Sequence, residues 1–419
     1  MDIYGKYVGE DNFAIEVRSP GRWNNEAGPD FKNASLVIDG KPVTGDVEIH
    51  LKASDWFAHN HHNDQNYDRV VLHVVAKNDF SDERRDELPP MLCLSCTDNT
   101  DFDSFAKCAA LYNRMGTERT GRMLVNAGLK RYEDKKRAIL RSMLEQGAEN
   151  GCWKTLFDAA GFKRNRREFA ELFDRLCCYP FETINDSFEI VIWGESGLLP
   201  DLSVEQLQPE MNSYADAVWK KWWKTRWTAN KEIKWSSGGR PSNSPYRRIA
   251  VIISWYKAFA TKPINLLGRF AMDSSAEQLA KQAVKLLETS DALWDGYINF
   301  KTCSSRKARI AGRSFALETA VNVLLPALGA AAEVGYFGEA NKWKIADIAC
   351  NAWKCLPSTQ HNYITKEAGL KWFPDKEFRN KVMASAAARQ GVLHMYREYC
   401  EKACFDCNSC VFINSFWMC

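Results

Sequence analysis

The chain has 419 residues, of which 45% are hydrophobic and 26% charged, with a formal net charge of +3. This composition excludes a globally disordered chain, and the length suits two or three domains of roughly 100–200 residues. The net charge hides an asymmetry, because residues 1–104 contain 10 basic and 20 acidic residues, whereas residues 105–419 contain 46 basic and 33 acidic ones. The division is typical of a cation-binding module joined to a polyanion-binding one, and equally of two independently soluble domains.

The predicted elements of the first hundred residues are strands with one short helix. Alternating or short apolar runs, bounded by Gly, Pro, Asn and Asp, predict the strands. The turn signal at residues 39–42 joins the second and third strands into a hairpin, and Ser54 is placed to cap a short helix that starts at Asp55. The predicted strands are Phe13–Arg18, Ala34–Asp39, Gly45–Lys52, Val70–Lys77 and Met91–Ser95.

From about residue 105 the apolar period changes to 3.6 residues, which predicts a large all-helical domain. A cysteine-rich tail follows it. We therefore expect an α+β protein with a mixed β-sheet domain at residues 1–104, a helical domain at 105–395 and a metal-binding tail at 396–419.

Nothing in the sequence predicts a targeting or membrane segment. Residues 1–9 lack the basic start and apolar run of a secretory signal. The longest apolar stretch, Leu317–Val334, is interrupted by Asn322 and Pro326, so we expect no membrane-spanning helix. The 14 cysteines of this long chain indicate reduced thiols, and we expect a cytoplasmic protein without a membrane partner.

The third predicted strand carries four ionisable residues at a spacing of two: Asp46, Glu48, His50 and Lys52. Strand geometry puts these side chains on one face and the apolar residues between them on the other. A solvated face of the hairpin and a functional face explain this alternation equally well.

Two further carboxylates favour the functional interpretation. Asp30 starts the preceding hairpin strand, so we expect it beside Glu48 across the strand pair, and Glu26 lies four residues earlier. Carboxylates gathered in this way repel one another, and a hard divalent cation relieves the repulsion. The sequence therefore predicts a Mg²⁺ or Mn²⁺ site at the hairpin.

Five of the seven histidines lie between positions 50 and 73. His59 and His61 follow the short helix, and His73 lies within an apolar strand. Together with Asp30 and Glu48 these imidazoles make a ligand set that suits Zn²⁺ or Mn²⁺. A single histidine in an apolar strand is more often a hydrogen-bonded core residue, so both interpretations of His73 stay open.

A Pro-Asp pair ending in Asp30, the hairpin and the acid at Glu48 resemble the core of the PD-(D/E)xK nucleases. In that family an acid-x-Lys stands on the second strand, whereas here His50 occupies the lysine position and Lys52 follows one pleat further on. The resemblance implies that Asp30 and Glu48 hold a metal ion that activates water against a phosphodiester bond. It also implies that Glu26 and His50 assist and that Lys52 stabilises charge.

A wider set of motifs resembles a bacterial family, domain-of-unknown-function family 2851, along nearly the whole chain. The family has no established activity, so the resemblance implies kinship and leaves the function open. The motifs include Gly28–Phe31, Gly45–His50, Ser54–Trp56, His59-x-His61, Tyr67, Val71–Val75, Arg240–Pro245 and Gln390-Gly391.

The tail contains Cys400, Cys404, Cys407 and Cys410, spaced as C-x3-C-x2-C-x2-C. Four such thiolates can hold a [4Fe–4S] cluster or a tetrahedral Zn²⁺, and they can also stay unliganded. The first three match the radical-SAM spacing, but that motif belongs near the start of a barrel, and no barrel is predicted after the tail. Certain PD-(D/E)xK nucleases carry a cluster closed by C-terminal cysteines, so that resemblance implies a structural site here.

Basic residues of the helical part are candidate nucleic-acid contacts. Lys220 and Lys224 lie in a helix whose tryptophans form one stripe, which is typical of a buried face and also of base stacking beside phosphates. Arg240, Arg247 and Arg248 lie in and after a proline-rich loop, where arginine can reach phosphate. A solvated face is the ordinary alternative for both groups.

The leading hypothesis is a metal-dependent nuclease that acts on DNA or RNA. A rival, favoured by the histidine at position 50, is a non-catalytic nucleic-acid or protein-binding module that retains a nuclease fold. A third hypothesis is a histidine-ligated metal hydrolase of a small substrate. Convergence of Asp30, Glu48 and His50 would support the first hypothesis, and a meeting of the later histidines within metal-ligand reach would support the third.

Overall fold

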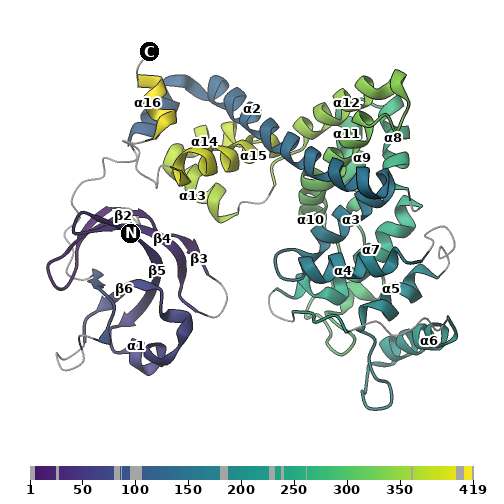
Figure 1. The fold of residues 1–419 in the computed structure, drawn as a ribbon, viewed down its shortest axis with the longest axis horizontal. Helices are drawn as coiled ribbons and strands as arrows, with labels where there is room; N and C mark the ends of the chain where they lie inside the picture. The colour runs from purple at the N-terminus through teal and green to yellow at the C-terminus, as the bar shows by residue number, and fades with distance from the viewer. Residues whose placement is uncertain are drawn as a thin grey trace. The chain divides into compact units, whose positions relative to one another are not determined.

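The structure is a computed structural model that describes residues 5–24, 28–79, 85, 87–94, 106–179, 187–225, 232–236, 240–260, 262–359, 362–402 and 410–417. The chain divides into two compact units (Figure 1). Unit 1 comprises residues 1–127, 361–383 and 391–419, and unit 2 comprises residues 128–360 and 384–390. The predicted boundaries at residues 104 and 395 mark changes of local pattern along the sequence, and as domain limits they stay a prediction.

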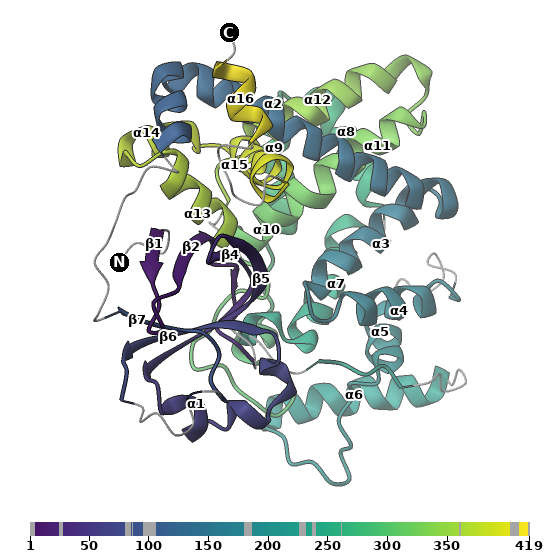
Figure 2. The same cartoon turned by 60° about the vertical axis from the view of Figure 1, so that its left-hand side comes forward.

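Unit 1 contains one mixed sheet (Figure 2). Its elements are β1 (Gly5–Val8), β2 (Ala14–Ser19), β3 (Arg22–Trp23), β4 (Phe31–Ile38), β5 (Lys41–Lys52), α1 (Asp55–Ala58), β6 (Val70–Lys77) and β7 (Met91–Cys93). The strand order is β1-β2-β4-β5-β6-β7, with β3 paired to β4. The strands from β1 to β5 are antiparallel neighbours, whereas β5, β6 and β7 run parallel. A sheet followed by helices is the α+β arrangement that the sequence predicts.

The five predicted strands and the short helix are all present. The predicted hairpin turn is formed by Asp39 and Gly40, both at positive φ, as a two-residue turn between twisted strands requires. Two strands, β1 and β3, are absent from the prediction because such short edge segments carry too little alternation. The predicted cap is wrong in one respect: Ser54 precedes α1, but its hydroxyl accepts no hydrogen bond from the helix backbone and donates to Asp79 instead.

The sheet of unit 1 has an apolar core made by alternate residues of its strands. Ile15, Leu36, Val47 and Leu72 are fully buried there, so four neighbouring strands contribute to one cluster. The helical elements that belong wholly or partly to unit 1 are α2 (Ala106–Gln146), α13 (Tyr363–Trp372), α14 (Lys376–Val382), α15 (Ala386–Met395), the π-helical turn η9 (Tyr396–Glu401) and α16 (Val411–Trp417).

Unit 2 is helical, and its core explains the high tryptophan content. Trp153, Trp193, Trp255 and Trp353 are among its largest fully buried side chains. Its further elements are α3 (Ala148–Gly161), α4 (Arg166–Leu176), α5 (Phe188–Ser196), α6 (Pro209–Thr225), α7 (Pro245–Phe259), α8 (Pro263–Asp273), α9 (Ala276–Leu287), α10 (Arg313–Thr319), the π-helical turn η7 (Ala320–Leu324), α11 (Leu325–Glu333) and α12 (Lys342–Cys355).

One helical stretch in the described part of the chain, Arg313–Glu333, is long and apolar enough to cross a membrane. In the structure 83% of its apolar window is buried. Burial to this extent is typical of a core helix, and this stretch packs against other helices of unit 2.

Candidate functional site

The β4-β5 hairpin brings two carboxylates together. Asp30 directly precedes β4, and because Phe31 pairs with Val47, Asp30 lies beside Glu48. The backbone N–H of Asp30 donates to Glu48 Oε2 at 2.9 Å, and that of Ile49 donates to Asp30 Oδ2 at 3.1 Å. Burial raises the pKa of Asp30, and the negative charge of Glu48 raises this pKa further. The two acids are neighbours, as the hairpin predicts.

The polar face of β5 is buried. Asp46, Glu48 and His50 are 5%, 6% and 8% exposed, whereas Ile49 and Leu51 on the other face are 43% and 77% exposed. The predicted alternation is present, but a solvated polar face is the wrong interpretation for the first three residues. Burying ionisable groups costs free energy, so these side chains need polar or charged partners within the fold.

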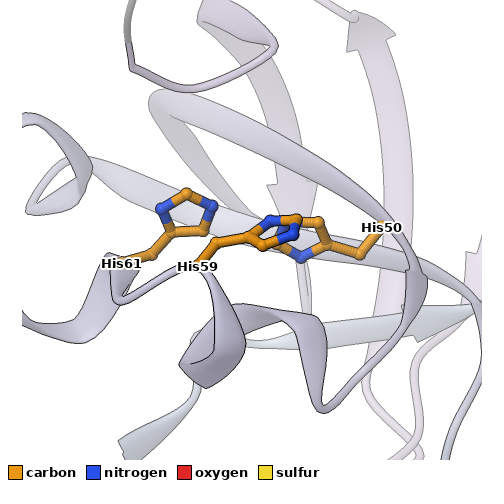
Figure 3. A group of neighbouring side chains, drawn as sticks. All are labelled: His50, His59 and His61. Atoms are coloured by element: carbon orange, nitrogen blue, oxygen red, sulfur yellow. The ribbon is translucent and has the colours of Figure 1, made fainter.

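His50 lies at the centre of a histidine cluster. Its Nδ1 is 2.9 Å from His73 Nε2, and its Nε2 is 3.2 Å from His59 Nδ1. Nε2 of His50 and Nε2 of His61 are 3.3 Å and 3.4 Å from Glu48 Oε1. His50, His59 and His61 each offer a nitrogen, and these atoms all lie within 4.8 Å of one another (Figure 3). These three histidines are the residues that could share one metal ion, and Glu48 contacts two of them without belonging to that group.

A short loop carries two of these histidines to β5. His59 ends α1 and His61 begins a 3-10 turn (His61–Asn63), with Asn60 between them in the left-handed conformation. Asparagine tolerates this conformation, which reverses the chain direction between the two turns. His61 then stacks on Tyr67, with ring centroids 3.7 Å apart. The ring of the buried Trp56 lies close to the rings of His61 and His73.

The environment keeps two of the imidazoles neutral. His73 is completely buried on β6, and burial lowers its pKa to about 3. Burial also lowers the pKa of His61, although the charge of Glu48 acts in the opposite direction. Burial and nearby carboxylates raise the pKa of Tyr67 to about 12. Neutral imidazole is the form that binds metal ions.

The structure rearranges the predicted histidine set. His59, His61 and His73 are the three that the sequence suggested as ligands, but the group within reach of one ion contains His50 in place of His73. His73 contacts His50 from the neighbouring strand. The stacking of Tyr67 on His61 was not predicted, although an aromatic residue close to a histidine cluster was an available signal.

Glu26, Cys404 and Cys407 lie outside the described residues. Lys52 is exposed at the end of β5, and its charge acts on Asp79.

The described cysteines of the tail lie near a buried tyrosine. Burial raises the pKa of Tyr112, and the thiols of Cys108, Cys400 and Cys410 raise this pKa further. Residues from α2 and from the tail therefore meet around Tyr112. No spacing in the sequence connects Cys108 with the tail, so the sequence contains no signal for this meeting.

The predicted nucleic-acid contacts fall into two groups. Lys220 and Lys224 are exposed on α6, where Lys220 pairs with Asp216 at 2.6 Å, and Arg240 is exposed in its loop. Arg247 and Arg248 are buried, so neither a solvated face nor contact with a phosphate backbone describes them in this structure.

These two arginines have structural contacts within unit 2. Arg248 lies over the ring of Phe315 at 3.7 Å. The guanidinium of Arg247 donates to four backbone carbonyls, those of Trp294, Tyr297, Ala308 and Arg309. These carbonyls surround Arg247 because loop segments distant in the sequence pack together. The pattern of basic residues along the sequence therefore could not predict this contact.

Comparison with known proteins identifies the family. The family model described as "Protein of unknown function (DUF2851)" matches residues 6–347, which include the sheet, the histidine cluster and most of unit 2. No curated protein and no solved structure matches the chain. The chain belongs to the DUF2851 family.

Proposed function

We propose that this protein is a metal-dependent phosphodiesterase that cleaves DNA or RNA, acting in the cytoplasm. The observation that carries the proposal is the pair of the half-buried Asp30 and the buried Glu48 beside three histidines that can share one ion. The order of the elements adds support, because an antiparallel hairpin, a helix and then a parallel strand follow one another as in the PD-(D/E)xK core.

The proposed chemistry assigns separate roles to the residues of the cluster. A divalent ion bound there would supply Lewis acidity and activate a water molecule. The half-buried Asp30 is the candidate base that accepts the proton of the attacking water. Tyr67 is a phenol and keeps its proton at neutral pH, so its hydroxyl can donate to a substrate oxygen.

The cation that the PD-(D/E)xK pattern supplies by lysine has no counterpart at position 50. A neutral imidazole stabilises a developing negative charge less than an ammonium group does. We therefore assign His50 to metal binding and retain Lys52 as the candidate cation for the substrate, at the exposed end of β5.

Hydrolysis assays test the proposal. Wild-type protein is supplied with Mg²⁺, Mn²⁺ or Zn²⁺ and incubated with bis(p-nitrophenyl) phosphate and with single-stranded and double-stranded DNA and RNA. We expect cleavage, and a loss of about 100-fold or more in Glu48→Gln. Glu16→Gln is the matched control. Glu16 lies on β2 of the same sheet, and its partly exposed carboxylate pairs with Arg18. Equal rates for the two variants, or no cleavage with any metal, would contradict the proposal.

A second candidate function is favoured by the predominance of histidine in the cluster. Three imidazoles around one carboxylate are typical of metal hydrolases that act on small substrates. Hydrolysis of nitrophenyl phosphates or esters without cleavage of any polynucleotide would support this candidate. Binding of nucleic acid without hydrolysis would instead support the non-catalytic module.

We also propose a structural [4Fe–4S] or Zn²⁺ site in the tail, at Cys400, Cys404, Cys407 and Cys410. The gathering of Cys108, Cys400 and Cys410 around Tyr112 supports a thiol-rich environment.

Metal content and the visible spectrum of anaerobically purified protein test the tail site. Iron with broad absorption, lost in Cys407→Ala, would identify the cluster, and zinc lost in the same variant would identify a zinc site. Unchanged metal content in Cys407→Ala would refute a metal at the tail.

A further inference from the structure

Three of the separations between candidate ligand atoms of the cluster match those of a tetrahedral metal site. Metal–ligand bonds of about 2.0–2.1 Å to the corners of a tetrahedron separate the ligands by about 3.3–3.4 Å. The observed separations are 3.2 Å from His50 Nε2 to His59 Nδ1 and 3.3 Å from His50 Nε2 to Glu48 Oε1. His61 Nε2 lies 3.4 Å from the same oxygen. Three of the six edges of a four-ligand tetrahedron therefore have the length expected around one ion, and the three histidine nitrogens lie within 4.8 Å of one another.

The hydrogen bonds within the described part of the chain do not satisfy all the buried polar atoms of this cluster. His61 Nε2 is buried and has no hydrogen-bond partner among the residues that the structure describes. Glu48 is buried, and its ion pairs within the described part of the chain are with His50 and His61 rather than with lysine or arginine. Buried polar atoms are nearly always paired, and a buried carboxylate needs a cation. A bound metal ion meets both requirements at once.

The donor set selects the kind of ion. Mg²⁺ prefers six oxygen ligands in an octahedron, which three imidazoles and one carboxylate oxygen do not provide. Zn²⁺ and Co²⁺ accept imidazole nitrogen together with carboxylate oxygen, and Zn²⁺ is almost always tetrahedral when the protein supplies four ligands. The cluster therefore suits a zinc-class ion better than the Mg²⁺ expected from the carboxylates alone.

His73 determines which nitrogen of His50 can bind the ion. A metal-binding histidine ordinarily donates its other ring N–H to an acceptor, which sets its tautomer. His50 Nδ1 is 2.9 Å from His73 Nε2, so binding through His50 Nε2 places the His50 proton on Nδ1 and directs it to His73. His73 is completely buried against Trp56, so its ring is held in place to accept.

From these observations we propose that His50, His59 and His61 bind one zinc-class ion and that Glu48, which lies beside two of these imidazoles, completes its four-coordinate shell. His73 is a positioning residue that holds His50 in the metal-binding tautomer. The inference concerns the site on which the proposed function rests, but metal binding itself requires no hydrolysis.

Titration of the metal-free full-length chain with Co²⁺ tests the four-ligand site, because the visible absorption of Co²⁺ reports its coordination number. We expect an intense four-coordinate spectrum that His59→Ala loses and His62→Ala retains. His62 is the matched control, since it is an exposed histidine of the same turn and contacts Asn63. The difference between the two variants isolates this site from the C-terminal cysteines. A weak six-coordinate spectrum, or identical spectra for the two variants, would overturn the inference.

A pair of His73 variants tests the positioning role. The amide oxygen of His73→Gln can accept the His50 proton, whereas His73→Leu offers no acceptor. We expect His73→Gln to bind Co²⁺ within about threefold of wild type and His73→Leu to bind it about 10–100-fold more weakly, with circular dichroism verifying that both fold. Equal affinities would overturn the positioning role.

The two proposals fail separately. A four-coordinate Co²⁺ spectrum in a protein that cleaves no phosphodiester would refute the proposed function and support the metal site. Cleavage that depends on Mg²⁺, without a four-coordinate spectrum, would refute the zinc-class site and support the nuclease.

Discussion

At Gly391 the helix α15 lies very close to α2, and substitution of this glycine by alanine tests the contact. A Cβ atom at this position of α15 would lie 1.8 Å from the carbonyl oxygen of Leu124 on α2, whereas real contacts essentially never fall below 3.0 Å. The obstacle is backbone, so no side-chain rotation relieves it, and the helices must separate by about 1 Å. Overpacking costs about 1–3 kcal/mol. We expect Gly391→Ala to lower the free energy of unfolding by about 3 kcal/mol, at the upper end of this range.

Gly121 provides the matched control for this substitution. It lies on α2, and a Cβ atom there would meet nothing within 4 Å. Because alanine is favoured over glycine in a helix, Gly121→Ala should gain up to about 1 kcal/mol. The same added methyl group is thus expected to have opposite effects at the two positions, about 4 kcal/mol apart.

Urea unfolding followed by far-ultraviolet circular dichroism, with calorimetry of the same samples, measures both variants. At about 2–4 °C per kcal/mol, Gly391→Ala should lower the melting temperature of the affected transition by about 6–12 °C. A Gly391→Ala protein that unfolds within about 1 kcal/mol of wild type would refute the close approach of α2 and α15.

Three further predictions follow from burial and metal linkage. Arg247→Met removes the guanidinium that donates to four carbonyls and should cost about 3–5 kcal/mol. Arg248→Met removes a buried guanidinium that donates to Asn243 and has no carboxylate partner among the described residues, so it should stay within about 1 kcal/mol of wild type; equal melting temperatures for the two variants would contradict this. Burial raises the pKa of Glu318 in the folded state, so the folded protein binds its proton more tightly, and Glu318→Gln should be the more stable protein at pH 7. The stability difference between Glu318→Gln and wild type should shrink as the pH falls from above the folded-state pKa of Glu318 towards its unfolded-state pKa. Urea titrations in which this difference grows as the pH falls would contradict the prediction. Zn²⁺ at 100 times its dissociation constant should stabilise the metal-free protein by about 2.7 kcal/mol. We expect EDTA to reverse this stabilisation and His59→Ala to lack it. Equal stabilisation of His59→Ala and wild type would place the ion elsewhere.

Much of the candidate site could be predicted from local patterns. The spacing of two along β5 predicted that Glu48 and His50 share a face, and the hairpin predicted that Asp30 lies beside Glu48. The density of histidines after position 50 indicated a metal site. Local patterns could not choose among the histidines, because the meeting of His59 and His61 with β5 depends on the path of the loop.

Backbone stereochemistry is a local property, so the sequence by itself determined the strands, the hairpin turn and which side chains share a face. It left undecided which face of β5 is buried, because both faces alternate equally well. The tertiary structure decided this residue by residue, since packing of the sheet buries Val47 and Glu48 on opposite faces and exposes Leu51. It also decided that His73 contacts His50, because that contact depends on the register between β5 and β6. Register and burial arise from contacts between segments distant in the chain, which no local pattern records.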